Sequence, residues 1–195
     1  MWSRPGKIRV EGSAHTVAKA INIKNTVDRY GFFENQLDGG TYMTFDQTIS
    51  GQHVQSICTN FNGNPTFGSY IKINGVLLAG DQRGLAPDGV DTRTAPFQMA
   101  RGHTMIIMNS HGAVQSTNCY DTYGNAGLCS TMATALHAMP AGWVVAIGTY
   151  DATSCTQALR DAFTNYFGDN AYPSTSIWNS VRISQMFLGK RNSTA

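Results

Sequence analysis

Charged side chains are scarce in this sequence. Of 195 residues, 12 are Asp or Glu and 14 are Lys or Arg, so 13% are charged, about half of the usual ~25%. The formal net charge is only +2, which is too small to indicate binding to the phosphates of nucleic acid. The surface must therefore be largely neutral and polar. Such a surface suits sugars and protein assemblies better than nucleic acid.

Long apolar runs are also missing. No stretch of 18 or more apolar residues occurs, so no segment predicts a membrane-spanning helix. Residues 1–12 contain no apolar core of a signal peptide. We therefore expect a protein that inserts into no membrane. We also expect it to stay in the cytosol until lysis, unless a signal has been removed from it.

The four cysteines form no C-x-x-C pair, and no histidine lies at zinc-finger spacing. We therefore expect no structural zinc site, and no motif indicates another metal or a cofactor. An even number of cysteines permits disulfides, with three complete pairings, but buried free thiols are an equal alternative. Cys119 and Cys129 flank the turn-rich residues 121–128, so we predict that these two lie close together. A bridge between them would stabilise the fold by roughly 2–3 kcal/mol.

The stretch from Gly142 to Asp151, GWVVAIGTYD, contains the clearest buried strand. Trp143 to Gly148 carry no charge and are mostly apolar or β-branched. A run of this length without period-2 alternation predicts a strand that is buried on both faces. Polar Thr149 and Asp151 mark the point where the strand leaves the core. Loops at this end are the first place to look for a binding site.

Further strands and helices are predicted from apolar spacing and from turn residues such as Asn74-Gly75, which is a strong hairpin signal. The predicted strands include residues 41–49, 52–61, 71–73, 76–78, 103–109, 113–120, 176–183 and 185–188, and the predicted helices are residues 131–139 and 154–167. Residues 81–98 read as a long loop. This order predicts a mixed α+β fold with two short helices.

A boundary between two parts is indicated by residues 62–68, NGNPTFG, which are rich in turn formers. We expect residues 1–65 to be a β-rich attachment or oligomerisation segment. Residues 66–195 are then expected to be a domain that folds without the first part.

Five spaced motifs within residues 69–191 resemble the interleukin-like epithelial–mesenchymal transition inducer domain family. The motifs are Arg101-Gly102-His103, residues 109–112 (NSHG), residues 120–124 (YDTYG), residues 142–151, and Val181-Arg182 followed by residues 186–190 (MFLGK). The resemblance implies a β-sandwich-like fold with helices on the sheets and no known enzymatic chemistry. Members occur as secreted signalling proteins, as carbohydrate-binding modules and in bacteriophage tail-fibre and other virion proteins.

Two functions remain open after this resemblance. The first is a bacteriophage virion protein of the tail fibre, tail tip or baseplate, located in the tail. It would be a homo-oligomer that binds other virion proteins and a host-surface glycan. The second is a secreted, cytokine-like or extracellular carbohydrate-binding factor. The low charge, the Asn-, Thr- and Gly-rich composition and the lack of a signal peptide favour the first.

The candidate ligand-binding residues are Asp121, Tyr123, Tyr150, Asp151 and Arg182. Asp121 and Asp151 each follow a predicted strand and lie beside aromatic residues. A carboxylate next to an aromatic ring suits the hydroxyls and the apolar face of a pyranose. The alternatives are structural: either Asp can accept backbone N–H bonds in a turn or cap a helix, and Arg182 can pair with an Asp inside the domain.

Catalytic and metal sites are weaker interpretations. Ser110, His111 and Asp121 supply the residue types of a hydrolase triad, but adjacent Ser and His in a tight turn point in different directions. A metal site from His103, His111 and Asp121 has no recognised ligand spacing. We therefore expect a protein that is not an enzyme.

Overall fold

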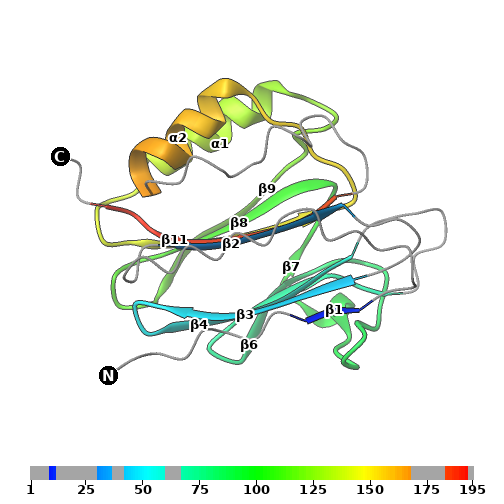
Figure 1. The fold of residues 1–195 in the computed structure, drawn as a ribbon. Coiled ribbons are helices and arrows are strands. Elements are labelled where there is room, and N and C mark those ends of the chain that lie inside the picture. Colours follow the sequence, from blue (N-terminus) through cyan, green and yellow to red (C-terminus); the bar gives the residue numbers. More distant parts are fainter. Residues whose placement is uncertain (1–8, 12–29, 37–41, 60–66, 168–182, 193–195) are drawn as a thin grey trace.

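The computed structural model describes residues 9–11, 30–36, 42–59, 67–167 and 183–192. The fold is mixed α+β, as predicted, and has three layers: two helices, a five-stranded sheet and a six-stranded sheet (Figure 1). The elements are β1 (Arg9–Glu11), β2 (Tyr30–Gln36), β3 (Tyr42–Ile49), β4 (Gln52–Thr59), β5 (Tyr70–Ile73), β6 (Val76–Gly80), η1 (Thr92–Thr94), β7 (Phe97–Gln98), β8 (Gly102–Met108), β9 (Val114–Tyr120), α1 (Gly127–Ala138), β10 (Val144–Tyr150), α2 (Gln157–Phe167) and β11 (Ile183–Lys190).

The five-stranded sheet lies in the middle of the molecule, between the helices and the six-stranded sheet (Figure 1). Its strand order is β2-β11-β10-β8-β9, and every neighbouring pair is antiparallel. The six-stranded sheet has the order β1-β3-β4-β5-β6-β7 and is antiparallel except for the β6–β7 pair. Because both faces of the middle sheet are covered, the centres of its inner strands are apolar, and their few polar residues, such as His103 and Thr149, lie near the strand ends.

The central strand β10 confirms the prediction of burial on both faces. Val145 and Ile147 pack with the helices, whereas Val144 and Ala146 pack with the six-stranded sheet, and each of the four is at most 1% exposed. The period of two along the strand sends alternate residues into two separate cores. Each fully buried Val or Ile stabilises the fold by about 1.5–3 kcal/mol.

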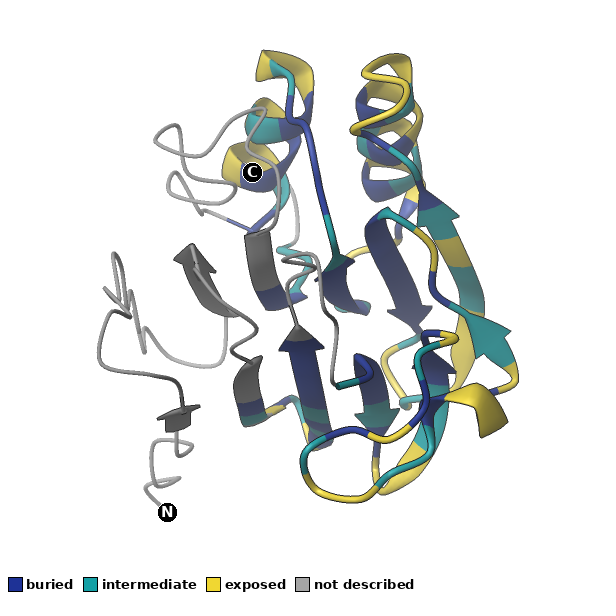
Figure 2. Cartoon of the chain, turned by 90° about the vertical axis from the view of Figure 1, so that its right-hand side faces the viewer, coloured by how far each residue is buried: buried dark blue, intermediate teal, exposed yellow. Residues whose placement is uncertain are grey.

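The helical layer closes the outer face of the middle sheet (Figures 1 and 2). Three aromatic residues, Phe163, Phe167 and Phe187, are fully buried between α2 and β11. Phe187 meets the other two rings edge-on, with centroid distances of 4.8 and 5.2 Å. Edge-to-face pairs of this kind contribute about 0.5–1.5 kcal/mol beyond burial. Neither described helix is long and apolar enough to cross a membrane.

The two tight hairpins occur where the sequence predicts them. Asn74 and Gly75 have φ of 51° and 80°, and Ser50 and Gly51 have φ of 51° and 77°. Two successive residues with positive φ make the turn whose twist matches paired strands. The two predicted helices are also confirmed. α1 begins earlier than predicted, at Gly127. The prediction began later because the first turn of this helix did not show a strong apolar pattern. The predicted strand at residues 176–183 lies almost entirely outside the described residues.

The chain does not divide at residue 65, which corrects the predicted boundary. Strand β4 pairs with β5, and β2 pairs with β11, so strands from the first 65 residues belong to both sheets. β3 and β4 also supply Phe45, Ile49 and Val54 to the core between the sheets. Residues 62–68 are rich in turn formers, as a linker is. Composition does not distinguish a linker between two strands of one sheet from a linker between two domains.

The predicted proximity of Cys119 and Cys129 is wrong. Cys129 lies in the core under the helices, where Tyr120 also points. Since side chains alternate along a strand, Cys119 points to the opposite face of the sheet. Its Sγ lies 3.3 Å from the carbonyl oxygen of Ala100, whereas the Sγ of Cys129 lies 3.3 Å from that of Ser154. Burial raises the pKa of Cys129 and raises that of Cys58 to about 11, so these side chains are packing groups and not reactive thiolates.

Candidate functional site

The strand register brings most of the predicted site residues to one end of the middle sheet. β8 begins where β9 and β10 end, because His103 pairs with Tyr120 and Gly102 pairs with Tyr150. Residues directly before β8 and directly after β9 and β10 therefore lie side by side. We call this region the polar end. Its members are Arg101, Asp121, Tyr123, Tyr150 and Asp151.

Arg101 and Asp121 form a two-pronged ion pair at the polar end. Arg101 Nε donates to Asp121 Oδ1 at 2.9 Å, and Nη2 donates to Oδ2 at 2.7 Å. The guanidinium lowers the pKa of Asp121, so this carboxylate is ionised at neutral pH. The two side chains are 42% and 40% exposed, so water screens the pair and its contribution to stability is small. Its geometry is nevertheless fixed by two parallel hydrogen bonds.

Asp121 also shapes the loop that follows β9. Its Oδ1 accepts the backbone N–H of Gly124 at 2.9 Å, which is the turn-forming role that the sequence left open for it. This turn presents Tyr123 to solvent, with 41% of the residue exposed. The guanidinium carbon of Arg101 lies 5.2 Å from the centre of the Tyr123 ring. Tyr123 is thus an exposed aromatic surface held next to a fixed charge pair.

Asp151 has a backbone conformation that few non-glycine residues adopt, with φ of 64°. It does not cap α2, which begins six residues later at Gln157. Among the described residues, the Asp151 carboxylate makes no hydrogen bond. The hydrogen bond to Asp121 raises the pKa of Arg101, and the charge of Asp151 adds a smaller contribution in the same direction. A partly exposed carboxylate with vacant acceptor positions therefore lies near Arg101 at the polar end.

Tyr150 has a structural role that the sequence did not indicate. Its side chain packs toward the core between the two sheets. Arg83 Nε donates to its hydroxyl at 3.0 Å, and the guanidinium carbon lies 4.2 Å from the ring centre. Because the Arg83 guanidinium packs on the ring of Tyr150 and donates to its hydroxyl, Tyr150 is not the open aromatic surface that we predicted. Tyr123 remains as the exposed ring of the site.

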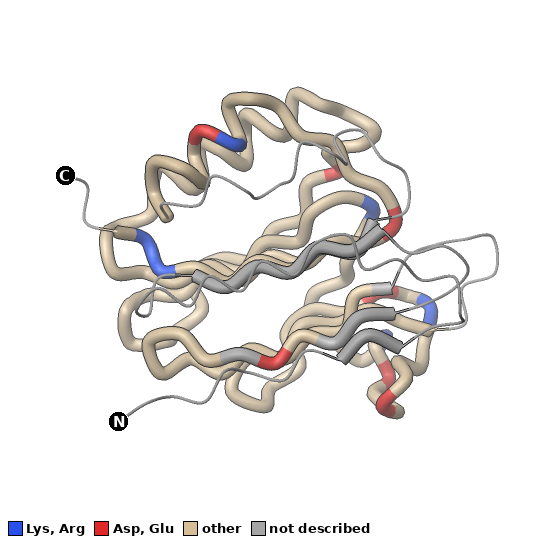
Figure 3. Tube along the Cα trace, viewed as in Figure 1, with Lys and Arg blue, Asp and Glu red and all other residues tan. Residues whose placement is uncertain are grey.

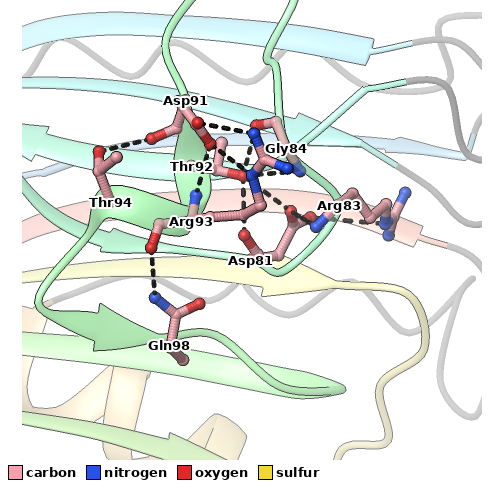
Figure 4. A network of polar contacts seen from close by, with 8 residues as sticks. All are labelled: Asp81, Arg83, Gly84, Asp91, Thr92, Arg93, Thr94 and Gln98. Atoms are coloured by element: carbon pink, nitrogen blue, oxygen red, sulfur yellow. Dashed lines mark hydrogen bonds and ion pairs between the residues drawn. The ribbon is translucent and has the colours of Figure 1, made fainter.

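Arg83 is itself held by a buried carboxylate. Its Nε lies 3.5 Å from Asp81 Oδ2, and the two side chains are only 8% and 1% exposed. Asp81 also accepts the backbone N–H groups of Ser69 and Arg83, at 2.9 and 3.0 Å. Thr92 lies against the same carboxylate, with its hydroxyl 3.1 Å from Oδ1 (Figure 4). Through the contact of Arg83 with Tyr150, this Asp81 network joins the six-stranded sheet to the end of β10 and helps to hold the polar end in place.

Two residues of this region, Arg101 and Arg83, were missed as site residues. Arg101 stands at the head of a motif that the sequence singled out, and its position directly before a buried strand was an available signal. Arg83 gave no such signal, because its partner Tyr150 lies 67 residues away along the chain. Arg182, the fifth predicted residue, lies outside the described residues.

The catalytic and metal interpretations do not assemble in space. Ser110 Oγ lies 3.4 Å from His111 Nδ1, so these two side chains do meet, contrary to our expectation. They follow β8 at one end, however, whereas His103 and Asp121 lie at the polar end. Seven strand residues separate the two ends by roughly 20 Å. His103 is fully buried, with Nδ1 3.0 Å from the hydroxyl of Thr122. Across the described residues, no group of three or more Asp, Glu, His or Cys side chains could hold a metal ion.

Gly102 allows the strands to approach closely enough for the polar end to form. Its φ is 108°, and a Cβ at this position would lie 1.9 Å from the carbonyl oxygen of Tyr120. We expect Gly102→Ala to destabilise the fold by roughly 2–4 kcal/mol, because overpacking adds to backbone strain. Gly75→Ala is the matched control, since Gly75 has φ of 80° but no atom within 4 Å of the added Cβ. Denaturant unfolding measures both, and equal losses would contradict the close approach.

The described residues include few charged side chains of either sign. Several of these lie at the end of the molecule where β8 begins (Figure 3). No family model matches this chain, and no curated protein matches its sequence. The resemblance to the interleukin-like inducer domain therefore stays a prediction. The polar end offers an aromatic ring, a guanidinium and two carboxylates within one small exposed area.

Proposed function

We propose that this chain is a structural and adhesion protein of a bacteriophage virion that binds a host-surface glycan at the polar end. The observation that carries the proposal is the exposed ring of Tyr123 beside the fixed Arg101–Asp121 pair. Sugar C–H groups pack on aromatic faces, and charged groups of fixed geometry hold hydroxyls by strong hydrogen bonds. No other described part of the chain combines these features in an exposed position.

The polar groups at this end can both donate hydrogen bonds to sugar hydroxyls and accept hydrogen bonds from them. Among the described residues Arg101 Nη1 has no acceptor, so it is available as a donor, and the Asp151 carboxylate is available as an acceptor. The two acidic residues and one arginine give no excess of positive charge. A neutral glycan is therefore favoured over a strongly anionic polymer. One exposed ring and two polar groups give a weak site, on the order of mM, which is useful only when several copies act together.

The placement in a virion is supported by the neutral, polar composition of the chain and by its resemblance to a domain found in virion proteins. Other virion proteins are then its partners, and the tail is its location. A secreted carbohydrate-binding factor is the alternative for the same site. Mass spectrometry of purified particles from the source separates the two, because only the virion protein is present in particles at a fixed copy number.

A glycan-array screen of the full chain, followed by variants at the polar end, tests the glycan proposal. We expect Tyr123→Ala to reduce binding to the best array glycan by roughly tenfold, while Tyr123→Phe retains the ring and most of the binding. Arg101→Ala should also reduce binding. Arg93→Ala is its matched control, because Arg93 makes the same two-pronged pair with Asp91, the N-cap of the short helix η1, and no described aromatic ring contacts this pair.

The same variants can also contradict the proposed glycan site. Both tyrosine variants and both arginine variants must melt like the wild type, since their side chains are largely exposed. Equal glycan binding by folded Tyr123→Ala and wild type would place the site elsewhere. Equal losses in Arg101→Ala and Arg93→Ala would indicate a general charge effect and not a site at the polar end.

A further inference from the structure

Strand β9 forms an outer edge of the middle sheet. In the strand order of the described residues, its neighbour is β8 on one side and no strand follows on the other. The difference in burial is clear: every residue of β8 is buried, whereas six of the seven residues of β9 are exposed or half-buried (Figure 2). One row of backbone N–H and C=O groups along β9 therefore faces away from its own sheet.

Apart from one register shift at its start, this edge lacks the features that usually protect sheet edges from pairing. Its sequence, VQSTNCY, contains no charged residue and no proline, and it is seven residues long. A register shift near Val114 affects only the first part of the strand and leaves residues 116–120 in regular pairing with β8. In contrast, the described edge strands of the other sheet are short, with three residues in β1 and two in β7. Short edges, edge lysines and prolines are the common protection, and β9 has none of them.

We propose that β9 pairs antiparallel with β9 of a second copy of this chain, which joins two five-stranded sheets into one continuous sheet. An antiparallel edge can pair with itself about a two-fold axis, so each copy presents the same surface. With Thr117 at the axis, Ser116 faces Asn118 within the regularly paired part of the strand. Like charges opposite each other would disfavour such a pair, and this strand has no charge.

The neutral edge favours a second copy over a foreign peptide. A peptide that adds a strand gains affinity from the backbone but gains specificity from side-chain pockets or charges along the edge. β9 offers small polar side chains and only one exposed large apolar residue, Val114. A second copy of β9 places neutral side chains opposite the neutral side chains of the first copy, so no charge is left unpaired. The proposal does not depend on glycan binding, although a dimer would carry two polar ends.

Light scattering of the full chain after size exclusion, over a wide concentration range, tests the proposal. We expect a species of twice the 21.1 kDa chain mass that dissociates on dilution. The variant Gln115→Lys with Asn118→Lys places charges on side chains that are already exposed in one copy. We expect it to weaken dimerisation at least tenfold without changing the melting curve. The control is Thr131→Lys with Ala138→Lys, which adds the same charge to exposed positions of α1.

Hydrogen exchange of the wild type gives a second measurement that does not rely on a variant. Backbone amides of residues 114–120 should become more protected as the concentration rises, whereas the exposed loop near Asp91 should not change. A chain that is monomeric at every concentration would overturn the proposal. So would a dimer that the β9 lysines leave intact, or a dimer without added protection of β9, because either places the interface elsewhere.

Discussion

Residues 66–195 produced without the first 65 residues are expected to remain unfolded. Their removal takes β3 and β4 from the six-stranded sheet and β2 from the middle sheet. The core between the sheets loses the buried side chains of Phe45, Ile49 and Val54. At about 1.5–3 kcal/mol each, these three account for roughly 5–9 kcal/mol, which is comparable to the whole stability of a domain.

The measurement is a thermal melt of the fragment, followed by near-ultraviolet circular dichroism, with the full chain as the control. We expect no cooperative transition in the fragment alone. Adding residues 1–65 as a separate polypeptide should restore a transition, because the missing strands pair through backbone hydrogen bonds that need no covalent link. A fragment that melts cooperatively by itself would restore the boundary at residue 65 that the sequence predicted.

Asp81→Ala is expected to be the most damaging single substitution outside the apolar cores. The carboxylate is 1% exposed and lies against Arg83 and Thr92 (Figure 4). It also accepts the backbone N–H of Ser69. Removing it takes the carboxylate partner from the buried Arg83 guanidinium and one acceptor from each of two backbone N–H groups. Breaking a buried ion pair from one side costs about 3–5 kcal/mol. For a chain of this size, that corresponds to a melting temperature lower by roughly 10 °C.

Asp91→Ala is the matched control for this substitution. Asp91 also pairs with an arginine two residues further along the chain, Arg93, but the Arg93 side chain is 56% exposed. Because solvent screens the exposed pair, we expect little change in its melting temperature. Calorimetry of both variants makes the comparison. If Asp81→Ala melted like Asp91→Ala, the buried network would not support the end of β10.

The Asp81 variant also connects stability to the proposed site. Arg83 holds Tyr150, and Tyr150 precedes Asp151 at the polar end. Loss of Asp81 should therefore weaken glycan binding as well as the fold, whereas Tyr123→Ala should weaken binding alone. This difference separates the residues that contact a ligand from those that position them.

Local patterns were sufficient for the elements that depend on neighbouring residues. The continuous apolar run of β10 required two covered faces, and the structure places one core on each side of it. Asn74-Gly75 formed the predicted turn because Asn and Gly both tolerate positive φ, and a second turn of the same kind joins the strands that were predicted at residues 41–49 and 52–61. The sequence also predicted that Asp121 and Asp151 each follow a strand, but they lie at the same end of the sheet because β9 and β10 both pair antiparallel with β8.

Only the tertiary structure decided which segments pair and which side chains meet. The sequence contains no signal that β4 pairs with β5 across residues 62–68, because strand pairing depends on contacts between distant segments and not on local composition. The same reason explains Arg83, whose partner Tyr150 is 67 residues away, and the error over Cys119 and Cys129, where a short loop joins opposite faces of one sheet. What the sequence by itself determined is most of the strands, the two helices and the tight turns, whereas β2 and β7 were not predicted. The register and layering of these elements, which place Arg101 beside Asp121 and turn Tyr150 toward Arg83, arise from the burial of both faces of the middle sheet.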